Sequence, residues 1–251
     1  MNIAIITGAS SGLGIEFYKE MQKECLDEIW VIARREAVLN EICQKHGKIK
    51  SRVIPLDLTL DESIDKFSSL LSNENPTIKF LFNNAGFGAY GTVEDLGAKK
   101  QADMIDLNVK ALTKITSLSL KYMNEGSKII NISSIVAFSP VPNFASYSAT
   151  KAYVMSFSRA LRHELRKRKI NVTAICPGPM PTEFFNVAGV EKGKTNLMEK
   201  FPFCSPEKVA KKGLNAAKKG RAVYTPRALY KFLRIVGKAT PHSILINFVV
   251  A

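Results

Sequence analysis

Six short apolar runs, each followed by a stretch with helix-like composition, constrain the fold of this chain more than any other feature of its sequence. The runs are Ile3–Thr7, Ile29–Ala33, Ser51–Leu56, Ile78–Asn83, Lys128–Ile132 and Asn171–Ile175. They read as continuous apolar segments rather than alternating ones, which is typical of parallel strands covered on both faces. The pattern predicts an α/β fold of the Rossmann type, a doubly wound parallel sheet with helices on both sides.

The domain organisation expected from this pattern is simple. A chain of 251 residues that is 46% hydrophobic can bury one sizeable core, and it has no internal repeat, low-complexity stretch or Pro/Gly/Ser-rich linker. We therefore expect a single domain over residues 1–251. Right-handed crossovers would place all strand carboxyl ends along one edge of the sheet, so functional residues should follow the strands.

Cysteine and histidine usage argues against several classes of protein. Cys25, Cys43, Cys176 and Cys204 form no C-x-x-C pair, and His46, His163 and His242 are scattered. We therefore expect neither a disulfide framework nor a metal site, and a reducing, cytoplasmic setting. The apolar segments Ile3–Ile6 and Ser243–Ala251 are too short for a signal peptide or a membrane span.

The positive charge is concentrated near the C-terminal end. The formal net charge is +14, and from Lys200 onward there are eleven Lys and Arg against one acid, Glu207. A solvated basic face is the ordinary interpretation, and an anionic partner such as a lipid surface, nucleic acid or an acyl carrier is the alternative. No recognised nucleic-acid-binding module accompanies the charge, so we expect no nucleic-acid partner.

A glycine-rich turn directly follows the first apolar run. It reads Thr7-Gly8-Ala9-Ser10-Ser11-Gly12-Leu13-Gly14 and leads into a helical segment from Ile15 to Lys23. In such a turn Gly8 permits the tight bend, Gly12 lets the backbone approach a pyrophosphate, and Gly14 allows close packing of helix on sheet. The helix N-terminus presents N–H groups to the phosphates. We expect a dinucleotide site that includes Gly8, Ser10, Ser11, Gly12, Leu13 and Gly14.

The spacing G-x-x-x-G-x-G after a threonine resembles the short-chain dehydrogenase/reductase family, among whose members hydroxysteroid dehydrogenases and 3-oxoacyl reductases are the most similar in type. Further family motifs follow in order: Asn83-Asn84-Ala85-Gly86, Asn108, Asn131-Ile132-Ser133-Ser134, Tyr147-Ser148-Ala149-Thr150-Lys151 and Pro177-Gly178. The resemblance extends from Met1 to about Thr182. It implies a nicotinamide cofactor and a homo-oligomer formed through the helices that hold Asn108 and Tyr147.

The end of the second apolar run indicates which cofactor is preferred. Arg34 and Arg35 stand there, twenty residues past Gly14, where the adenosine ribose is expected. An arginine can pair with the 2′-phosphate of NADP, whereas a carboxylate would accept hydrogen bonds from a free 2′-hydroxyl. We expect NADP(H); the alternative is that both arginines are solvated. The resemblance further implies that Asp57 and Leu58 border the adenine, that Asn83, Asn84, Ala85 and Gly86 face the adenosine side, and that Thr182 lies near the carboxamide. It also implies that Pro177 and Gly178 bind the cofactor.

Tyr147 and Lys151 are the candidate catalytic pair. They are four residues apart, so they project from the same face of one helix, and the ammonium is expected to lower the pKa of the phenol. Such a phenol can exchange a proton with a ketone or an alcohol. Ser134 ends the fifth run and can hydrogen-bond the developing alkoxide, whereas strand alternation points Ser133 away. The resemblance implies that Lys151 also holds the nicotinamide ribose and that Asn108 organises a proton-relaying water chain.

The loops beyond the strand ends are apolar and indicate a hydrophobic substrate. Residues 183–203 contain several Phe, Val and Leu side chains and are expected to form a lid. A steroid or bile-acid-like ketone and a long-chain 3-oxoacyl thioester fit equally well, and packing of these residues against the core or a second subunit is the alternative. The tail, 227–251, begins as a basic amphipathic helix from Arg227 to Lys238 that can cover the pocket, join subunits or rest on an anionic membrane, in that order of preference.

A protein of this fold can also bind NADP(H) without catalysis, as a sensor or scaffold. The complete set Asn108, Ser134, Tyr147 and Lys151 argues for an enzyme that interconverts an alcohol and a ketone.

Overall fold

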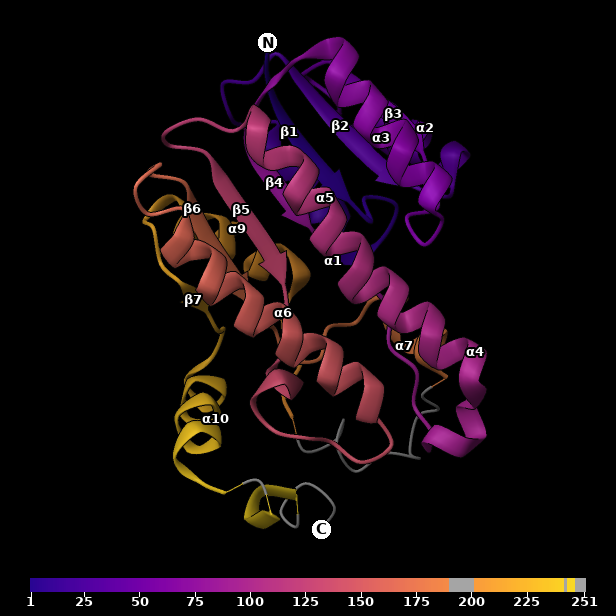
Figure 1. Cartoon of the computed structure of the whole chain (residues 1–251), viewed down its shortest axis with the longest axis vertical. Helices are drawn as coiled ribbons and strands as arrows, with labels where there is room; N and C mark the ends of the chain where they lie inside the picture. The colour runs from indigo at the N-terminus through magenta and orange to yellow at the C-terminus, as the bar shows by residue number, and fades with distance from the viewer. Residues whose placement is uncertain (190–200, 242, 247–251) are drawn as a thin grey trace.

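The centre of the molecule is a seven-stranded parallel sheet with the order β3-β2-β1-β4-β5-β6-β7 (Figure 1). In the computed structural model, which describes residues 1–189, 201–241 and 243–246, the strands are β1 (Asn2–Thr7), β2 (Glu28–Ala33), β3 (Ser51–Pro55), β4 (Thr77–Asn83), β5 (Lys128–Ile132), β6 (Asn171–Ile175) and β7 (Val223–Tyr224). The expected doubly wound α/β architecture is confirmed.

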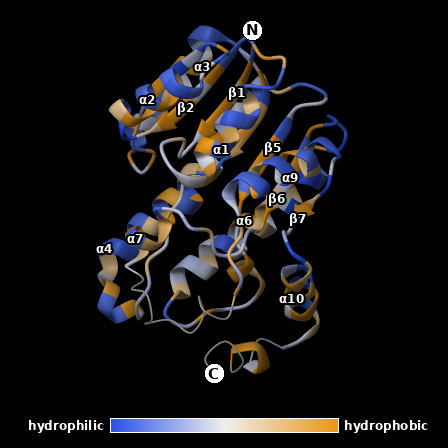
Figure 2. Cartoon of the chain, turned by 180° about the vertical axis from the view of Figure 1, so that it is seen from behind, coloured by the Kyte–Doolittle hydropathy of each residue, from blue (hydrophilic) through white to orange (hydrophobic). Residues whose placement is uncertain are grey.

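Helices cover both faces of the sheet (Figures 1 and 2). One layer contains α1 (Gly12–Met21), α2 (Glu36–His46) and α9 (Pro206–Lys218), and the other contains α3 (Asp61–Glu74), α5 (Leu112–Ser119) and α6 (Ala145–Glu164). Along β1, Ala4 and Ile6 pack against the first layer, and Ile3 and Ile5 pack against the second. Because successive side chains of a strand point to opposite faces, both sets must be apolar, which explains the continuous apolar runs.

The strand and helix boundaries differ from the expected ones by a few residues. β1, β2 and β4 begin one residue early, β3 ends at Pro55, and α1 begins at Gly12 instead of Ile15. The seventh strand was not predicted. β7 is only two residues long and pairs with the end of β6, Val223 with Ala174 and Tyr224 with Ile175.

The remaining helical elements gather beyond the carboxyl ends of the strands, where Figure 1 places α4, α7 and α10. They are α4 (Val93–Ile105), the π-helix η1 (Asp106–Ala111), the 3-10 helix η3 (Ile135–Phe138), α7 (Phe184–Ala188) and α10 (Ala228–Ala239). A second 3-10 helix, η2 (Leu120–Tyr122), lies elsewhere and directly follows α5. The tail helix expected from Arg227 to Lys238 is α10. Part of the expected lid, 190–200, and the last residues of the tail, 247–251, lie outside the described residues.

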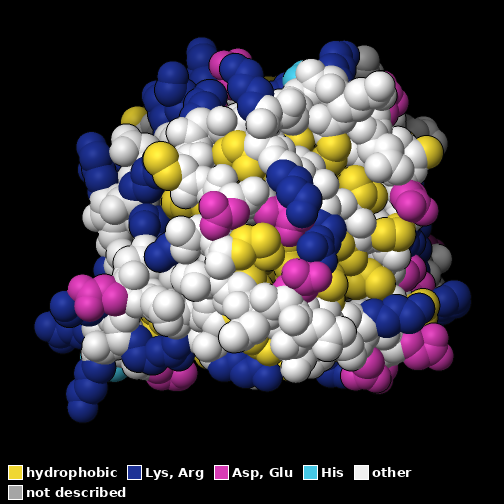
Figure 3. Space-filling view, turned by 90° about the horizontal axis from the view of Figure 1, so that it is seen from above, with side chains coloured by type: hydrophobic (Ala, Val, Ile, Leu, Met, Phe, Trp, Pro, Cys, Tyr) yellow, Lys and Arg dark blue, Asp and Glu magenta, His cyan; other side chains and the backbone are white. Residues whose placement is uncertain are grey.

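At the opposite end of the molecule, which carries the N-terminus, Lys, Arg and acidic side chains lie among and around patches of hydrophobic side chains (Figure 3). At the start of β2, buried Glu28 pairs with Lys50 at 3.1 Å and with Arg52 at 3.3 Å, and it accepts a hydrogen bond of 2.7 Å from the Trp30 indole. This network compensates a buried carboxylate far from the strand carboxyl ends, so its role is structural. Among the described helices, none has the length and apolar character needed to cross a membrane.

Candidate active site

The turn after β1 depends on glycine at two positions. Gly8 and Gly12 have φ angles of +66° and +50°, in the left-handed region that side chains disfavour. A Cβ atom at Gly8 would lie 2.8 Å from the Ala85 Cα, and one at Gly12 would lie 3.1 Å from the Thr182 side chain. Gly14 was expected to allow close packing of the helix on the sheet. A Cβ atom at Gly14 would instead lie 2.2 Å from the Gly8 carbonyl oxygen, so the missing side chain makes room for the turn. The third glycine therefore lets the helix start pack onto the turn itself.

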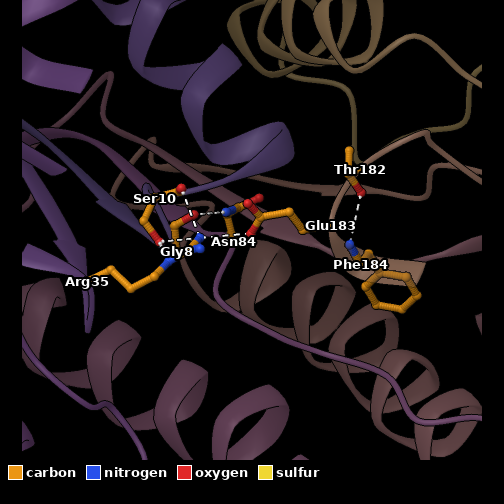
Figure 4. Close-up of polar contacts among 7 residues, drawn as sticks. All are labelled: Gly8, Ser10, Arg35, Asn84, Thr182, Glu183 and Phe184. Atoms are coloured by element: carbon orange, nitrogen blue, oxygen red, sulfur yellow. Dashed lines mark hydrogen bonds and ion pairs between the residues drawn. The ribbon is translucent and has the colours of Figure 1, made fainter. Parts of the chain in front are cut away.

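Side chains from β1 and from the loop after β4 hold this turn in place, and Figure 4 shows the contact of Asn84 with Gly8. The Asn84 amide donates hydrogen bonds of 3.0 Å to the carbonyl oxygens of Thr7 and Gly8. The Thr7 hydroxyl accepts from the backbone N–H groups of Asn84 and Ala85, both at 3.0 Å, and donates to the Phe82 carbonyl. Thr7 was not predicted as a site residue, although its place directly before Gly8 was the available signal.

The turn borders a cavity of about 1330 Å³ that extends along the carboxyl ends of the strands. The expected cofactor residues that line it are Gly8, Ser10, Ser11, Gly12, Leu13, Arg34, Arg35, Asp57, Leu58, Asn84, Ala85, Gly86, Tyr147, Lys151, Pro177, Gly178 and Thr182. Ser11 stands at the N-cap of α1 without a side-chain cap hydrogen bond, so the helix start is free to receive an anionic group. These residues fit a dinucleotide with its pyrophosphate at the N-terminus of α1.

The two arginines after β2 have different surroundings. Arg34 is largely exposed, and its guanidinium lies 3.7 Å from the Asp57 carboxylate. Arg35 donates to the Ser10 carbonyl oxygen at 3.1 Å and pairs with Glu183 at 2.9 Å, so it spans the space between the glycine turn and the segment before α7 (Figure 4). Glu183 therefore competes with any phosphate for Arg35, and Arg34 is the more available of the two.

The candidate catalytic side chains come together where α6 meets the end of β5. Tyr147 and Lys151 lie on consecutive turns of α6, and the Lys151 Nζ is 5.7 Å from the centre of the Tyr147 ring. The Lys151 ammonium donates a hydrogen bond of 2.9 Å to the Ile132 carbonyl oxygen of β5. Ser134 follows the strand and lines the same cavity as Tyr147, and its hydroxyl accepts a hydrogen bond of 3.3 Å from the Val136 N–H. The neighbouring Ser133 also borders the cavity, and its hydroxyl donates a hydrogen bond of 2.8 Å to the Lys151 carbonyl oxygen.

The protonation behaviour of the phenol differs from the expectation. Burial raises the pKa of Tyr147 well above its ordinary value, and the hydrogen bond with Ser134 opposes this effect only in part. Burial also lowers the pKa of Lys151 to about 8. The expected lowering of the Tyr147 pKa by the lysine is not seen, because desolvation by burial is the largest influence on this phenol. The phenol is held in its protonated form, which suits a proton donor.

Asn108 supports the site from a distance instead of lining the cavity. It lies in the π-helix η1, which interrupts the helix between α4 and α5. Its amide oxygen accepts from the Phe87 N–H at 3.0 Å, and its amide nitrogen donates to the Phe87 carbonyl at 2.8 Å and to the Thr150 hydroxyl at 3.1 Å. Asn108 thus connects the loop after β4 to α6 beside Lys151. The π-helix was not predicted.

Replacing Asn108 by alanine is expected to lower the free energy of unfolding by about 2–3 kcal/mol, because the partly buried Phe87 N–H and carbonyl lose their hydrogen-bond partner. Urea denaturation followed by circular dichroism measures the change. The control is Asn40→Ala, since Asn40 is exposed on α2 and alanine favours helix. Equal denaturation midpoints for Asn108→Ala and wild type would contradict this role.

Aromatic side chains form the wall of the cavity around Tyr147. Its ring lies 5.7 Å from that of Phe144 and 5.4 Å from that of Phe184, and Phe184 in turn packs edge-on against Phe185 at 5.7 Å. Val136, Phe138 and Val141 from the segment after β5 also line this part of the cavity. The part beyond the phenol is therefore suited to an apolar compound.

Tyr230 of α10 is a supporting residue that the sequence did not single out. It is fully buried, and its ring occupies the space that a Cβ at Gly178 would need, 2.3 Å away. Its hydroxyl donates to the Pro202 carbonyl oxygen. Tyr230 thus joins α10 to the turn after β6 and to the end of the expected lid. An aromatic residue within an amphipathic helix gives no sequence signal for such a contact.

Comparison with known proteins gives consistent results. The family model described as short chain dehydrogenase matches residues 2–192. An uncharacterised oxidoreductase of Staphylococcus epidermidis is 30% identical over 199 residues, which cover 78% of this chain and 85% of that protein. The very-long-chain 3-oxoacyl-CoA reductase of Mus musculus is 32% identical over 194 residues, 73% of this chain and 61% of that protein. A short-chain dehydrogenase from Sphingobium yanoikuyae, solved in complex with NADPH, superposes with a TM-score of 0.80 at 24% identity and covers 95% and 94% of the two chains.

Proposed function

Since this chain belongs to the short-chain dehydrogenase/reductase family, we propose that it is an NADP(H)-dependent oxidoreductase that interconverts a secondary alcohol and a ketone on a bulky hydrophobic substrate. The observation that carries the proposal is the position of Tyr147. Its phenol lies beside Ser134 and Lys151, in the same cavity as the glycine turn. A nucleotide site and an acid–base group that share one cavity are what a hydride-transfer enzyme requires.

In the proposed reaction, the Tyr147 phenol donates its proton to the oxygen of a bound ketone. Burial keeps this phenol protonated, so the group is ready for reduction before substrate arrives. The Ser134 hydroxyl donates a hydrogen bond to the same oxygen and stabilises the negative charge that develops on it. When bound, the nicotinamide supplies the hydride. Lys151, fixed by the Ile132 carbonyl, provides the positive charge that favours the phenolate left after proton transfer.

The preference for NADP(H) rests on Arg34 in this proposal. Replacing Arg34 by alanine is expected to lower the affinity for NADPH by about 10- to 100-fold and to leave the affinity for NADH nearly unchanged, because a charge-assisted contact to a phosphate is worth about 1.5–3 kcal/mol. Calorimetric titration with both cofactors measures the ratio. The control is Arg166→Ala, since Arg166 is exposed and distant from the cavity. An unchanged ratio in Arg34→Ala would refute the assignment.

The substrate class is proposed from the cavity wall. Its apolar and aromatic lining suits a flat steroid or bile-acid-like ketone and also the chain of a 3-oxoacyl thioester. The mouse relative, by its name, reduces very-long-chain 3-oxoacyl-CoA, which supports the second choice. The alternative that the chain binds NADP(H) without turning it over predicts a different outcome in the following experiment.

A single screen tests the proposal. Oxidation of NADPH is followed by the loss of absorbance at its nicotinamide band while steroid ketones, 3-oxoacyl esters, sugars and small aldehydes are supplied in turn. Activity on the first two classes and not on the last two supports a hydrophobic substrate. Activity confined to sugars or small aldehydes would contradict the proposed substrate class. Silence with all four, together with tight NADPH binding, would favour the sensor.

A further inference from the structure

Helix α10 carries more apolar side chains than those that line the cavity. Its inner face lines the cavity with Phe232, Leu233, Val236 and Gly237. On the outside, Leu229 is 42% exposed and Ile235 is 62% exposed, and neither lines the cavity. Phe232 is 62% exposed although it also lines the cavity, so it lies at the mouth. An exposed apolar ridge therefore runs directly beside the entrance.

The contacts of α10 with the domain fix this ridge in its outward position. Tyr230 is buried against Gly178, and Gly237 lets the helix approach η3 so closely that a Cβ there would lie 2.4 Å from the Phe138 carbonyl oxygen. The Arg227 side chain donates to the Phe203 carbonyl oxygen at the start of the helix. With these three anchors the helix cannot turn about its axis to bury Leu229 and Ile235. Figure 1 places α10 and the helical turn at 243–246 at the pole opposite the N-terminus.

More exposed apolar side chains lie on other segments that border the cavity. Val187 of α7 is 52% exposed and lines the cavity, Phe203 is 47% exposed, and Ile244 is 48% exposed. Phe203 accepts the hydrogen bond from Arg227 through its carbonyl, and Leu245, next to Ile244, lines the cavity. The apolar ridge of α10 is therefore accompanied by exposed apolar groups from the other segments that border the cavity.

The segment of the chain that carries this ridge has charged side chains of one sign only. Residues 208–251 contain ten Lys and Arg and no Asp or Glu, and Arg227, Lys231, Arg234 and Lys238 fall at or on α10. Within the part of the chain that the structure describes, none of these four forms an ion pair with a carboxylate. A second copy of the chain on this face would bring like charges together, whereas an anionic surface would complement them.

We propose that the outer face of α10 docks this protein on bilayers that contain anionic phospholipids. Leu229, Phe232 and Ile235 enter the boundary between headgroups and acyl chains, and the Lys and Arg side chains contact the phosphates. The mouth of the cavity then opens at the bilayer surface. If the proposed function holds, a hydrophobic carbonyl compound dissolved in the bilayer reaches Tyr147 from there.

Sedimentation with vesicles tests the docking without substrate or cofactor, so its outcome does not depend on the proposed reaction. The full chain is mixed at low salt with vesicles of phosphatidylcholine alone or with 30% phosphatidylglycerol, a composition chosen on the scale of anionic leaflets. We expect binding to the anionic vesicles, weaker binding to the neutral ones, and a steep loss as salt is raised. Absence of binding to anionic vesicles at low salt would overturn the proposal.

Two pairs of variants identify the face. Leu229→Ser with Ile235→Ser is expected to weaken binding about tenfold or more, whereas Val93→Ser with Ile105→Ser, similarly exposed on α4, is expected to leave it unchanged. Lys231→Glu with Lys238→Glu should likewise weaken binding about tenfold or more, and Lys208→Glu with Lys212→Glu on α9 should weaken it much less. If a double variant on α10 and its control on another helix lost the same amount of vesicle binding, docking through α10 would be contradicted.

Analytical ultracentrifugation tests whether a second copy of the chain, and not a bilayer, binds the apolar ridge of α10. If the wild type is an oligomer that Leu229→Ser with Ile235→Ser dissociates, the ridge is a subunit interface and the proposal is wrong. An assembly state that these substitutions leave unchanged supports the bilayer as the partner. Circular dichroism melts of each variant confirm that the fold is intact, since all substituted side chains are exposed.

Discussion

Turnover of a ketone by Tyr147→Phe is expected to fall by at least about 10²- to 10⁴-fold, the range that a positioned acid–base group contributes. The substitution removes one oxygen and keeps the ring that packs between Phe144 and Phe184. The aromatic wall of the cavity is therefore preserved. Steady-state rates with a substrate from the screen, compared with wild type under the same conditions, measure the loss.

Cofactor affinity separates a chemical role of the phenol from a structural one. Tyr147→Phe should bind NADPH with nearly wild-type affinity in calorimetric titration, because the glycine turn and the arginines after β2 are untouched. Tyr153→Phe is the matched control: Tyr153 lies on the same helix, and its hydroxyl bonds Thr113 away from the cavity. We expect turnover within about twofold of wild type for the control. Wild-type turnover in Tyr147→Phe would refute the assigned role.

The sequence predicted the inner strands well because each must be apolar on both faces, whereas the edge strand β3 is only partly buried. Ile3 to Ile6 show the reason, since alternate side chains pack against different helical layers and both layers exclude water. β7 could not be predicted in this way. Val223 and Tyr224 are a strand only because the end of β6 offers them backbone partners, and two residues are too few to carry a pattern.

The grouping of Tyr147, Lys151 and Ser134 was also predictable, because helical spacing and the end of a strand fix where these side chains point. The direction of the Tyr147 pKa was not. It depends on burial by Phe144 and Phe184, which approach from the segments after β5 and β6, and no local pattern reports their distance. The π-helix at Asn108 was not predicted for a related reason. The side-chain amide of Asn108 forms its hydrogen bonds with Phe87 and Thr150, which are remote in sequence.

Lys151→Met is expected to make the protein without cofactor more stable and much less active. The Lys151 side chain is buried, and in the described structure its ammonium has one hydrogen-bond acceptor, the Ile132 carbonyl oxygen. Burial lowers the pKa of this group to about 8. Methionine has a similar length and no charge to desolvate, so the fold gains more than the lost hydrogen bond costs. At pH 7 the melting temperature should rise by roughly 3–6 °C.

The gain should depend on pH in a defined direction. In the unfolded chain a lysine titrates near ~10.4, above the value of about 8 in the fold. Below pH 8 the lysine is protonated in both states, and the folded state bears the full cost of the buried charge. Between pH 8 and ~10.4 this cost declines, and above that range it vanishes. The difference in melting temperature between Lys151→Met and wild type should therefore be largest below pH 8 and shrink as the pH rises.

Melting curves from pH 6 to pH 10 test this, with Lys66→Met as the control, because Lys66 is exposed on α3 and should shift the melting temperature by less than about 1 °C. Turnover of Lys151→Met should fall by at least about 10²-fold, since the charge that favours the Tyr147 phenolate is gone. A lower melting temperature at every pH would mean that Lys151 stabilises the fold and is not a destabilising group kept for catalysis. An unchanged turnover would remove Lys151 from the reaction. The melting temperature and the turnover are independent measurements. A residue that lowers the stability of the fold and raises turnover is therefore recognised when its replacement has opposite effects on the two.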